Sequence, residues 1–144
     1  DTDRSGRTET GEKTEVSIRG LHILLAEDNE LNMEIAEFLL QNEGAVVTKA
    51  WNGQEAVEIF EKSGSGEFDV ILMDIMMPVM NGYEAAKRIR SLDREDAKRI
   101  PIIAMTANAF AEDKMRAKEA GMNEHIGKPV DGKLLVKVIH ELME

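Results

Sequence analysis

Short apolar segments alternate along the chain with longer segments whose apolar residues recur every three or four positions. The short segments are rich in branched residues and have the length of strands. This composition is typical of strands that are buried on both faces, as in a parallel sheet. The predicted strands are HILLA (22–26), AVVTKA (45–50), FDVILM (68–73), IPIIAM (100–105) and the weaker NEHIG (123–127).

The longer segments have the spacing of amphipathic helices. In the first of them, Leu31, Ile35, Phe38 and Leu39 recur at three and four residues, so they are expected to form the apolar stripe of the helix. Turn signals, many of them with glycine, separate the units. Helices are predicted at 29–43, 53–62, 82–92, 109–120 and 131–143.

Five strands, each followed by a helix, predict an α/β fold. Such alternation implies right-handed crossovers and a doubly wound parallel sheet with helices on both faces. Residues 1–20 contain only Val16 and Ile18 as sizeable apolar side chains. Because such a segment buries too little to offset its ordering entropy, we expect a disordered linker or expression remnant at 1–20 and one domain at 21–144.

Length and charge exclude several function classes. The chain has 144 residues, which suits a single core, and its net charge is −10. We therefore expect no nucleic acid partner for this domain, since binding to the phosphate backbone depends on clustered cations. No apolar run approaches the roughly 18 residues that span a bilayer, so no membrane contact is expected. The absence of cysteine excludes disulfides and thiolate zinc sites.

Polar side chains stand at the carboxyl ends of four predicted strands. Glu27 and Asp28 follow the first strand, and Asp74, Thr106 and Lys128 end the third, fourth and fifth. Ligands of open parallel sheets bind at this edge, so these residues are expected to converge. Three clustered carboxylates repel one another and need a cation, and an all-oxygen ligand set suits Mg²⁺.

This constellation points to phosphoryl chemistry at Asp74. A divalent site beside a carboxylate, with Lys128 and Thr106 opposite, is suited to holding a phosphoryl group. Asp74 would be the nucleophile and would form an acyl phosphate. Structural interpretations also exist, because Asp28 and Thr106 could cap helices and Lys128 could lie in a plain turn. That interpretation is weakest for Asp74, since an isolated charge after an apolar run is costly.

Four motifs resemble those of a response-regulator receiver domain of two-component signalling. They are LLAEDN (24–29), LMDIMMPVMNG (72–82), MTAN (105–108) and GKPV (127–130), in this order. The resemblance covers about residues 21–144 and implies a flavodoxin-like (βα)5 fold with strand order 2-1-3-4-5.

The resemblance also implies the roles of the acidic residues. Asp74 would accept a phosphoryl group from a phosphohistidine. Asp28 and Asp74 would bind Mg²⁺ directly, with the backbone carbonyl of Met76 as the third protein ligand. Glu27 would act mainly through metal-bound water. A hydrolase of the haloacid-dehalogenase kind is disfavoured, because it needs an acid where Met76 stands.

The remaining site residues follow from the same resemblance. Thr106 and Lys128 would bind phosphoryl oxygens, and the Lys128–Pro129 bond is expected to be cis. His125 stands where the family usually has Tyr or Phe, an aromatic residue that swings inward as the threonine moves. His125 is therefore either the partner of Thr106 in a switch or a variant polar surface residue.

Partners and context are implied only by the family. A histidine kinase or a histidine-containing phosphotransfer domain would dock on the helix at 29–43, where Met33, beside the apolar stripe, is a candidate contact. A homodimer could form through the family's 4-5-5 face. We expect a cytoplasmic receiver from a hybrid sensor histidine kinase, acting as a switch or relay and assisting its own phosphorylation and dephosphorylation. The alternatives are a stand-alone or transcriptional regulator, and a non-phosphorylated pseudo-receiver that only binds.

Overall fold

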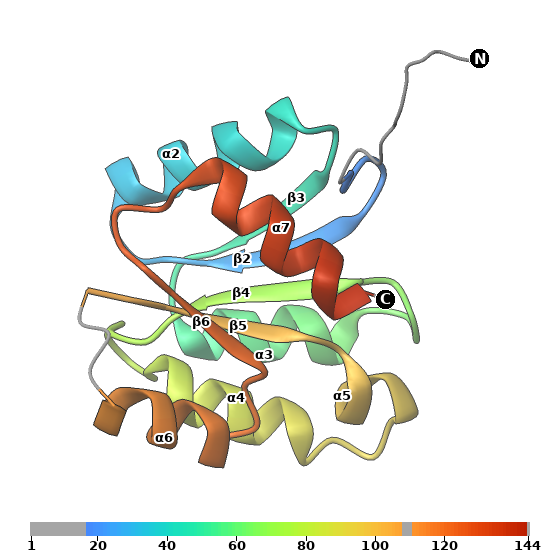
Figure 1. The fold of residues 1–144 in the computed structure, drawn as a ribbon. Coiled ribbons are helices and arrows are strands. Elements are labelled where there is room, and N and C mark those ends of the chain that lie inside the picture. The colour runs from blue at the N-terminus through green and yellow to red at the C-terminus, as the bar shows by residue number, and fades with distance from the viewer. Residues whose placement is uncertain (1–16, 108–110, 144) are drawn as a thin grey trace.

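The computed structural model of the chain describes residues 17–107 and 111–143, and it forms a parallel sheet between two layers of helices (Figure 1). The strands are β2 (His22–Ala26), β3 (Val46–Ala50), β4 (Val70–Asp74), β5 (Ile102–Thr106) and β6 (Glu124–Gly127). The helices are α2 (Glu30–Asn42), α3 (Gly53–Lys62), α4 (Gly82–Arg90), α5 (Glu95–Arg99), α6 (Ala111–Glu119) and α7 (Gly132–Met143).

The sheet order is β3-β2-β4-β5-β6, and all four strand pairs are parallel. This is the predicted 2-1-3-4-5 order of a flavodoxin-like fold. The three central strands are almost wholly buried, whereas the edge strand β3 is partly exposed. Two apolar clusters cover the two faces of the sheet: α2 and α7 contribute to one, and α3, α4, α5 and α6 contribute to the other.

Three helices begin with the same asparagine cap. The side chains of Asn29, Asn52 and Asn81 accept hydrogen bonds from backbone N–H groups three residues later, at 2.9, 2.8 and 2.9 Å. Such a cap satisfies one of the free N–H groups of the first helical turn. The starts of α2, α3 and α4 are therefore held firmly at the carboxyl edge of the sheet, where the strands β2, β3 and β4 end.

The apolar stripe predicted for the first helix does not face the sheet, as the stripe of an amphipathic helix usually does. Leu31, Ile35 and Phe38 are 65%, 45% and 66% exposed. Periodicity finds a stripe but does not say whether that stripe faces the sheet, because two stripes of α2 share the same spacing. Met33 was expected near a docking surface, yet it is 1% exposed. The buried residues of α2 are Met33, Ala36 and Leu40.

Two further elements differ from the sequence prediction. The helix predicted at 82–92 ends at Arg90, and the five-residue helix α5 that follows was not predicted at all. Only Ala97 of α5 is buried, so the segment carries no apolar period by which it could be recognised. For the helix predicted at 109–120, residues 109 and 110 lie outside the described part of the chain.

The globular part begins earlier than predicted. Ile18, assigned above to the linker, is 1% exposed and belongs to the same apolar cluster as Ala45. The N–H group of Gly20 donates to the carbonyl of Gly44 at 2.8 Å, which ties this segment to the turn before β3. A single isoleucine among polar residues gives too weak a pattern for this contact to be predicted. Residues 1–16 lie outside the described chain.

Candidate functional site

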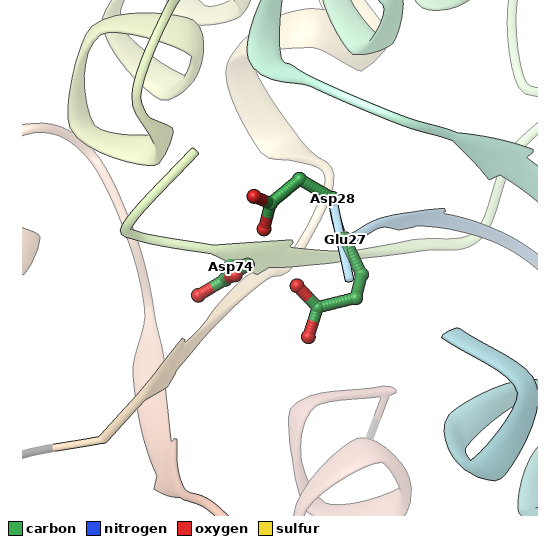
Figure 2. Close-up of side chains that lie close together, drawn as sticks. All are labelled: Glu27, Asp28 and Asp74. Carbon is green, nitrogen blue, oxygen red and sulfur yellow. The ribbon is translucent and has the colours of Figure 1, made fainter. Parts of the chain in front are cut away.

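Three carboxylates meet at the carboxyl edge of the sheet, as Figure 2 shows. Glu27 and Asp28 follow β2, and Asp74 is the last residue of the neighbouring strand β4. One carboxylate oxygen from each residue lies within 4.8 Å of the other two. The parallel pairing of β2 and β4 thus brings together acids that are far apart in the sequence.

Lys128 contacts two of these acids at the same edge of the sheet. It follows the edge strand β6, and its Nζ lies 2.8 Å from Glu27 Oε1 and 3.0 Å from Asp74 Oδ2. Glu27 and Asp74 are buried, at 1% and 3% exposure, whereas Asp28 is exposed. The Lys128–Pro129 peptide bond is cis, as expected from the resemblance. One ammonium group therefore faces two buried carboxylates.

The crowding of charge is visible in the pKa values. Burial raises the pKa of Asp74 to about 7, and the neighbouring Glu27 adds to the rise while Lys128 opposes it. Burial also acts to raise the pKa of Glu27, but its interactions with Asp74 and Lys128 hold that pKa below the ordinary value. Burial disfavours the charged form of Lys128, but its contacts with Glu27 and Asp74 raise its pKa overall. The site thus disfavours the ionised form of Asp74 when no cation is bound.

The donor set fits a hard divalent cation. Three carboxylates against one ammonium leave an excess of negative charge when all are ionised, and every ligand atom in the cluster is an oxygen. Mg²⁺ prefers such ligands, usually takes only one or two carboxylates, and keeps several waters. The exposed Asp28 leaves one side of the cluster open to solvent. A cation held there would also favour the ionised form of Asp74.

The loop after Asp74 has a fixed shape. The N–H group of Met76 donates to Asp74 Oδ1 at 3.3 Å, and that of Gly82 donates to the carbonyl of Ile75 at 2.9 Å. A Cβ atom on Gly82 would stand 2.3 Å from the backbone oxygen of Asp74, so only glycine fits this position. The Asn-Gly pair that ends the loop therefore serves both to cap α4 and to let the chain return close to Asp74.

Thr106 and His125 come from the two strands beyond β4. Thr106 ends β5 and is buried, and its backbone carbonyl accepts a hydrogen bond from the Lys128 N–H at 2.8 Å. His125 lies in β6 beside Ala104, and its side chain is 23% exposed. It lines a groove of about 400 Å³ between α6 and β6, with Lys114, Lys118 and Glu124 among the other lining residues. The side chain of His125 is thus partly buried and faces this groove.

Sequence reasoning named every acid of this cluster but missed parts of its geometry. It did not predict the ion pair between Lys128 and Glu27, which lie near opposite ends of the domain's sequence. No local signal carries that contact, because it depends on how β2 and β6 are placed in the sheet. The sequence showed the spacing of the apolar stripe on α2. It did not show that this stripe faces solvent rather than the sheet.

Comparison with known proteins assigns the family. The model of the response regulator receiver domain matches residues 23–140, so the chain belongs to this family. Histidine kinase 1 of Arabidopsis thaliana is 36% identical over 160 residues, an alignment that covers 90% of this chain and 13% of the kinase. The chain therefore spans only a small part of the length of that relative.

Two solved structures resemble the chain closely. The receiver domain of sensor histidine kinase PA1611 from Pseudomonas aeruginosa, with a magnesium ion in its active-site cleft, is 38% identical with a TM-score of 0.77, covering 86% of this chain and 98% of that one. The co-crystal of the Saccharomyces cerevisiae phosphotransfer protein Ypd1 with the Ssk1 receiver domain gives 35% identity and a TM-score of 0.76, covering 86% and 89%. Among the described helices, none has the length and apolar character needed to cross a bilayer.

Proposed function

We propose that this receiver domain accepts a phosphoryl group from a phosphohistidine onto Asp74. The observation that carries the proposal is the cluster itself: a buried carboxylate at a strand end, with Lys128 3.0 Å away and two more acids beside it. In the transfer, the phosphorus–nitrogen bond of the donor breaks and a bond forms between phosphorus and an Asp74 oxygen. The electron pair stays on the imidazole nitrogen, which takes up a proton. Asp74 must be ionised to act as the nucleophile.

The other site residues would neutralise and position charge. Lys128, already beside Asp74, would hold a phosphoryl oxygen, and Thr106 at the end of β5 would hold another. Asp28, Asp74 and the backbone carbonyl of Met76 would hold Mg²⁺, with Glu27 acting through a bound water. When bound, Mg²⁺ would offset the charge that develops on the transferred group. The ion reported in the PA1611 receiver domain supports this assignment.

Phosphorylation of Asp74 can be tested directly. With Mg²⁺ and acetyl phosphate, intact-mass analysis should find one phosphoryl group on the wild-type chain and none on Asp74→Asn. Asp93→Asn, a change at an exposed aspartate, should label like wild type. Equal labelling of wild type and Asp74→Asn would show that another group is the acceptor.

The proposed donor is a histidine kinase or a histidine-containing phosphotransfer domain that docks on α2. Leu31, Ile35 and Phe38 form an exposed apolar stripe on this helix, and α2 begins directly after the acidic residues. The complex of Ypd1 with the Ssk1 receiver domain supports a partner of this class. In this proposal the contact residues are the stripe itself rather than Met33.

The kind of protein that contains this domain is inferred from its relatives. We propose that the domain is a cytoplasmic switch or relay within a hybrid histidine kinase, since the similar Arabidopsis protein is a histidine kinase. A receiver from a stand-alone or transcriptional regulator is the alternative. The role of His125 as partner of Thr106, and a homodimer through α6, β6 and α7, stay predictions.

A further inference from the structure

The loop between β4 and α4 passes directly over the first residue of α3. The N–H group of Gly53 donates to the carbonyl of Met80 at 3.0 Å. A Cβ atom at Gly53 would stand 2.2 Å from that carbonyl oxygen and 3.0 Å from the carbonyl oxygen of Asn81. Both neighbours are backbone atoms, so no flexible side chain could move aside. A side chain at position 53 would therefore displace the loop.

Neither backbone conformation nor helix formation explains a glycine at this position. The φ of Gly53 is not positive, so an alanine could adopt its backbone conformation. Glycine is also a poor helix former, whereas alanine is the best. The cap of the helix does not involve Gly53, because the side chain of Asn52 accepts its hydrogen bond from the N–H group of Glu55. What excludes a side chain at Gly53 is therefore the close approach of the loop.

The loop depends on this hydrogen bond, because one of its turns is strained. Val79 has a φ of 68°, and the N–H group of Met80 donates to the carbonyl of Pro78 at 2.7 Å, which closes a three-residue turn around Val79. Such a turn is rare, and a β-branched residue tolerates a positive φ poorly. The Val79 side chain is 79% exposed, so packing within the domain does not offset this cost. The hydrogen bond from Gly53 holds the residue that follows the strained turn.

The other end of the same loop lies at the acidic site. Met76 follows Asp74 by two residues, and its N–H group donates to Asp74 Oδ1 at 3.3 Å. Its backbone carbonyl is the ligand proposed above for Mg²⁺. Only three residues separate Met76 from Met80. A shift of Met80 away from Gly53 would therefore also move the Met76 carbonyl.

We propose that Gly53 is a positioning residue for the metal site. It lets the Met80 carbonyl approach its N–H group, and it thereby holds the Met76 carbonyl where Mg²⁺ can bind. The proposal rests on the Mg²⁺ site assigned to Asp74 under the proposed function. Because Gly53 acts through the loop, its effect lies in the affinity for Mg²⁺. Groups that orient a metal ligand commonly change metal affinity about 10- to 100-fold.

The test is the variant Gly53→Ala, with Gly64→Ala as the matched control. Mg²⁺ binding is followed by the NMR shifts of the Asp28 and Asp74 amides, and the dissociation constant of Gly53→Ala should be about tenfold higher than that of wild type. A Cβ atom at Gly64, in the loop after α3, would meet Glu67 Oε1 at 3.8 Å, which is an ordinary contact. The dissociation constant of Gly64→Ala should therefore stay within about twofold of wild type.

Labelling by acetyl phosphate separates this role from a general loss of structure. In Gly53→Ala the Mg²⁺ concentration for half-maximal labelling should rise about tenfold, whereas the rate at saturating Mg²⁺ should approach that of wild type. A damaged or partly unfolded variant would instead label slowly at every Mg²⁺ concentration.

A measurement on wild type tests the same link without any variant. If the hydrogen bond between Gly53 and Met80 favours Mg²⁺ binding, then Mg²⁺ must favour that hydrogen bond by the same factor. Mg²⁺ should thus slow the amide exchange of Gly53 more than that of Ala56. The N–H group of Ala56 donates to the carbonyl of Asn52 at the start of the same helix, at 3.1 Å, and reports on the helix alone.

An unchanged dissociation constant in Gly53→Ala, or an equal weakening in Gly64→Ala, would overturn the proposal. Equal slowing of exchange at Gly53 and Ala56 would overturn it as well, and this comparison decides if Gly53→Ala does not fold. So would a wild-type chain that binds no Mg²⁺. If Mg²⁺ binds as expected but acetyl phosphate does not label Asp74, the phosphoacceptor function is refuted and the role of Gly53 stands.

Discussion

At the scale of single residues, the acidic centre is a site with too little positive charge. Lys128 contacts both Glu27 and Asp74, yet one ammonium group cannot balance two buried carboxylates and the exposed Asp28 beside them. A buried charge without a full partner is costly. In the metal-free protein, burial and the neighbouring Glu27 raise the pKa of Asp74 to about 7. Crowded carboxylates therefore destabilise the folded protein when all of them are ionised and no cation is bound.

In the metal-free protein, replacing Asp74 by asparagine should raise the free energy of unfolding. The pKa of Asp74 rises from its ordinary value of 3.8 to about 7 in the folded protein, so the folded state binds the proton more tightly. Wild type therefore loses free energy of unfolding as the pH rises from about 4 to 7, and loses no more from this group above that range. Asparagine avoids this loss. We expect Asp74→Asn to be more stable by roughly 1–3 kcal/mol at pH 8, with the gain shrinking towards pH 4.

Urea unfolding in the presence of EDTA at pH 8, 6.5 and 5 measures this difference. The exposed variant Asp93→Asn controls for the change of formal charge and should stay within about 0.5 kcal/mol of wild type. A gain for Asp74→Asn that is as large at pH 5 as at pH 8 would show that charge crowding is not its cause. Saturating Mg²⁺ should reduce or reverse the gain, because the cation binds the wild-type carboxylate.

At the scale of elements, α2 has two apolar faces with different roles. Met33, Ala36 and Leu40 attach the helix to the sheet, and Ala36 is small enough to allow a close approach. The other face carries Leu31 and Phe38, which are about two-thirds exposed at 65% and 66%. An exposed apolar stripe beside a recessed site is typical of a contact surface rather than of a core.

Substitutions on the two faces of α2 should have different effects on the free energy of unfolding. Met33→Ala should lower the free energy of unfolding by about 2–4 kcal/mol, because it removes buried side-chain volume from a packed core. Phe38→Ala should change it by about 0.5 kcal/mol or less, because little of the ring is buried in the domain. Denaturant unfolding of both variants measures the contrast. A loss of stability in Phe38→Ala as large as in Met33→Ala would mean that the ring packs within the domain.

At the scale of the whole molecule, contacts link the acidic site around Asp74 to the far edge of the sheet. Thr106 and Gly127 are neighbours in the register of β5 and β6, and Lys128 spans from the end of β6 to Asp74. The guanidinium of Arg116 on α6 lies 4.4 Å from the centre of the Tyr83 ring on α4. A ligand that binds better when Thr106 and Lys128 move inward can therefore shift the positions of α6 and β6, provided that it distinguishes the two states.

The corresponding prediction uses beryllofluoride with Mg²⁺ as a mimic of the acyl phosphate. Changes in amide exchange or in NMR shifts should extend from Asp74 to α6 and β6, and should be absent in Asp74→Asn. Mg²⁺ alone is the control for metal binding and should affect mainly the loops around Asp28 and Asp74. Changes confined to the neighbours of Asp74 would mean that His125, in place of the usual aromatic residue, has uncoupled the edge from the site.

The sequence alone determined the fold class, the five strands and the membership of the acidic centre. These features depend on local information: apolar runs predict buried strands, and in a parallel sheet the residues at strand ends meet at one edge. Glu27, Asp28 and Asp74 could be named for this reason without any coordinates. The cis bond before Pro129 was expected from the family motif and is present.

Only the tertiary structure decided which surfaces these elements present. It turned Leu31, Ile35 and Phe38 outward, placed Lys128 between Glu27 and Asp74, and set Val79 in a strained turn. Periodicity is unchanged when a helix rotates about its axis, so the buried face of α2 follows from packing against the sheet. Ion pairs between distant segments and backbone strain likewise arise from the arrangement of the whole chain, which no short stretch of sequence records.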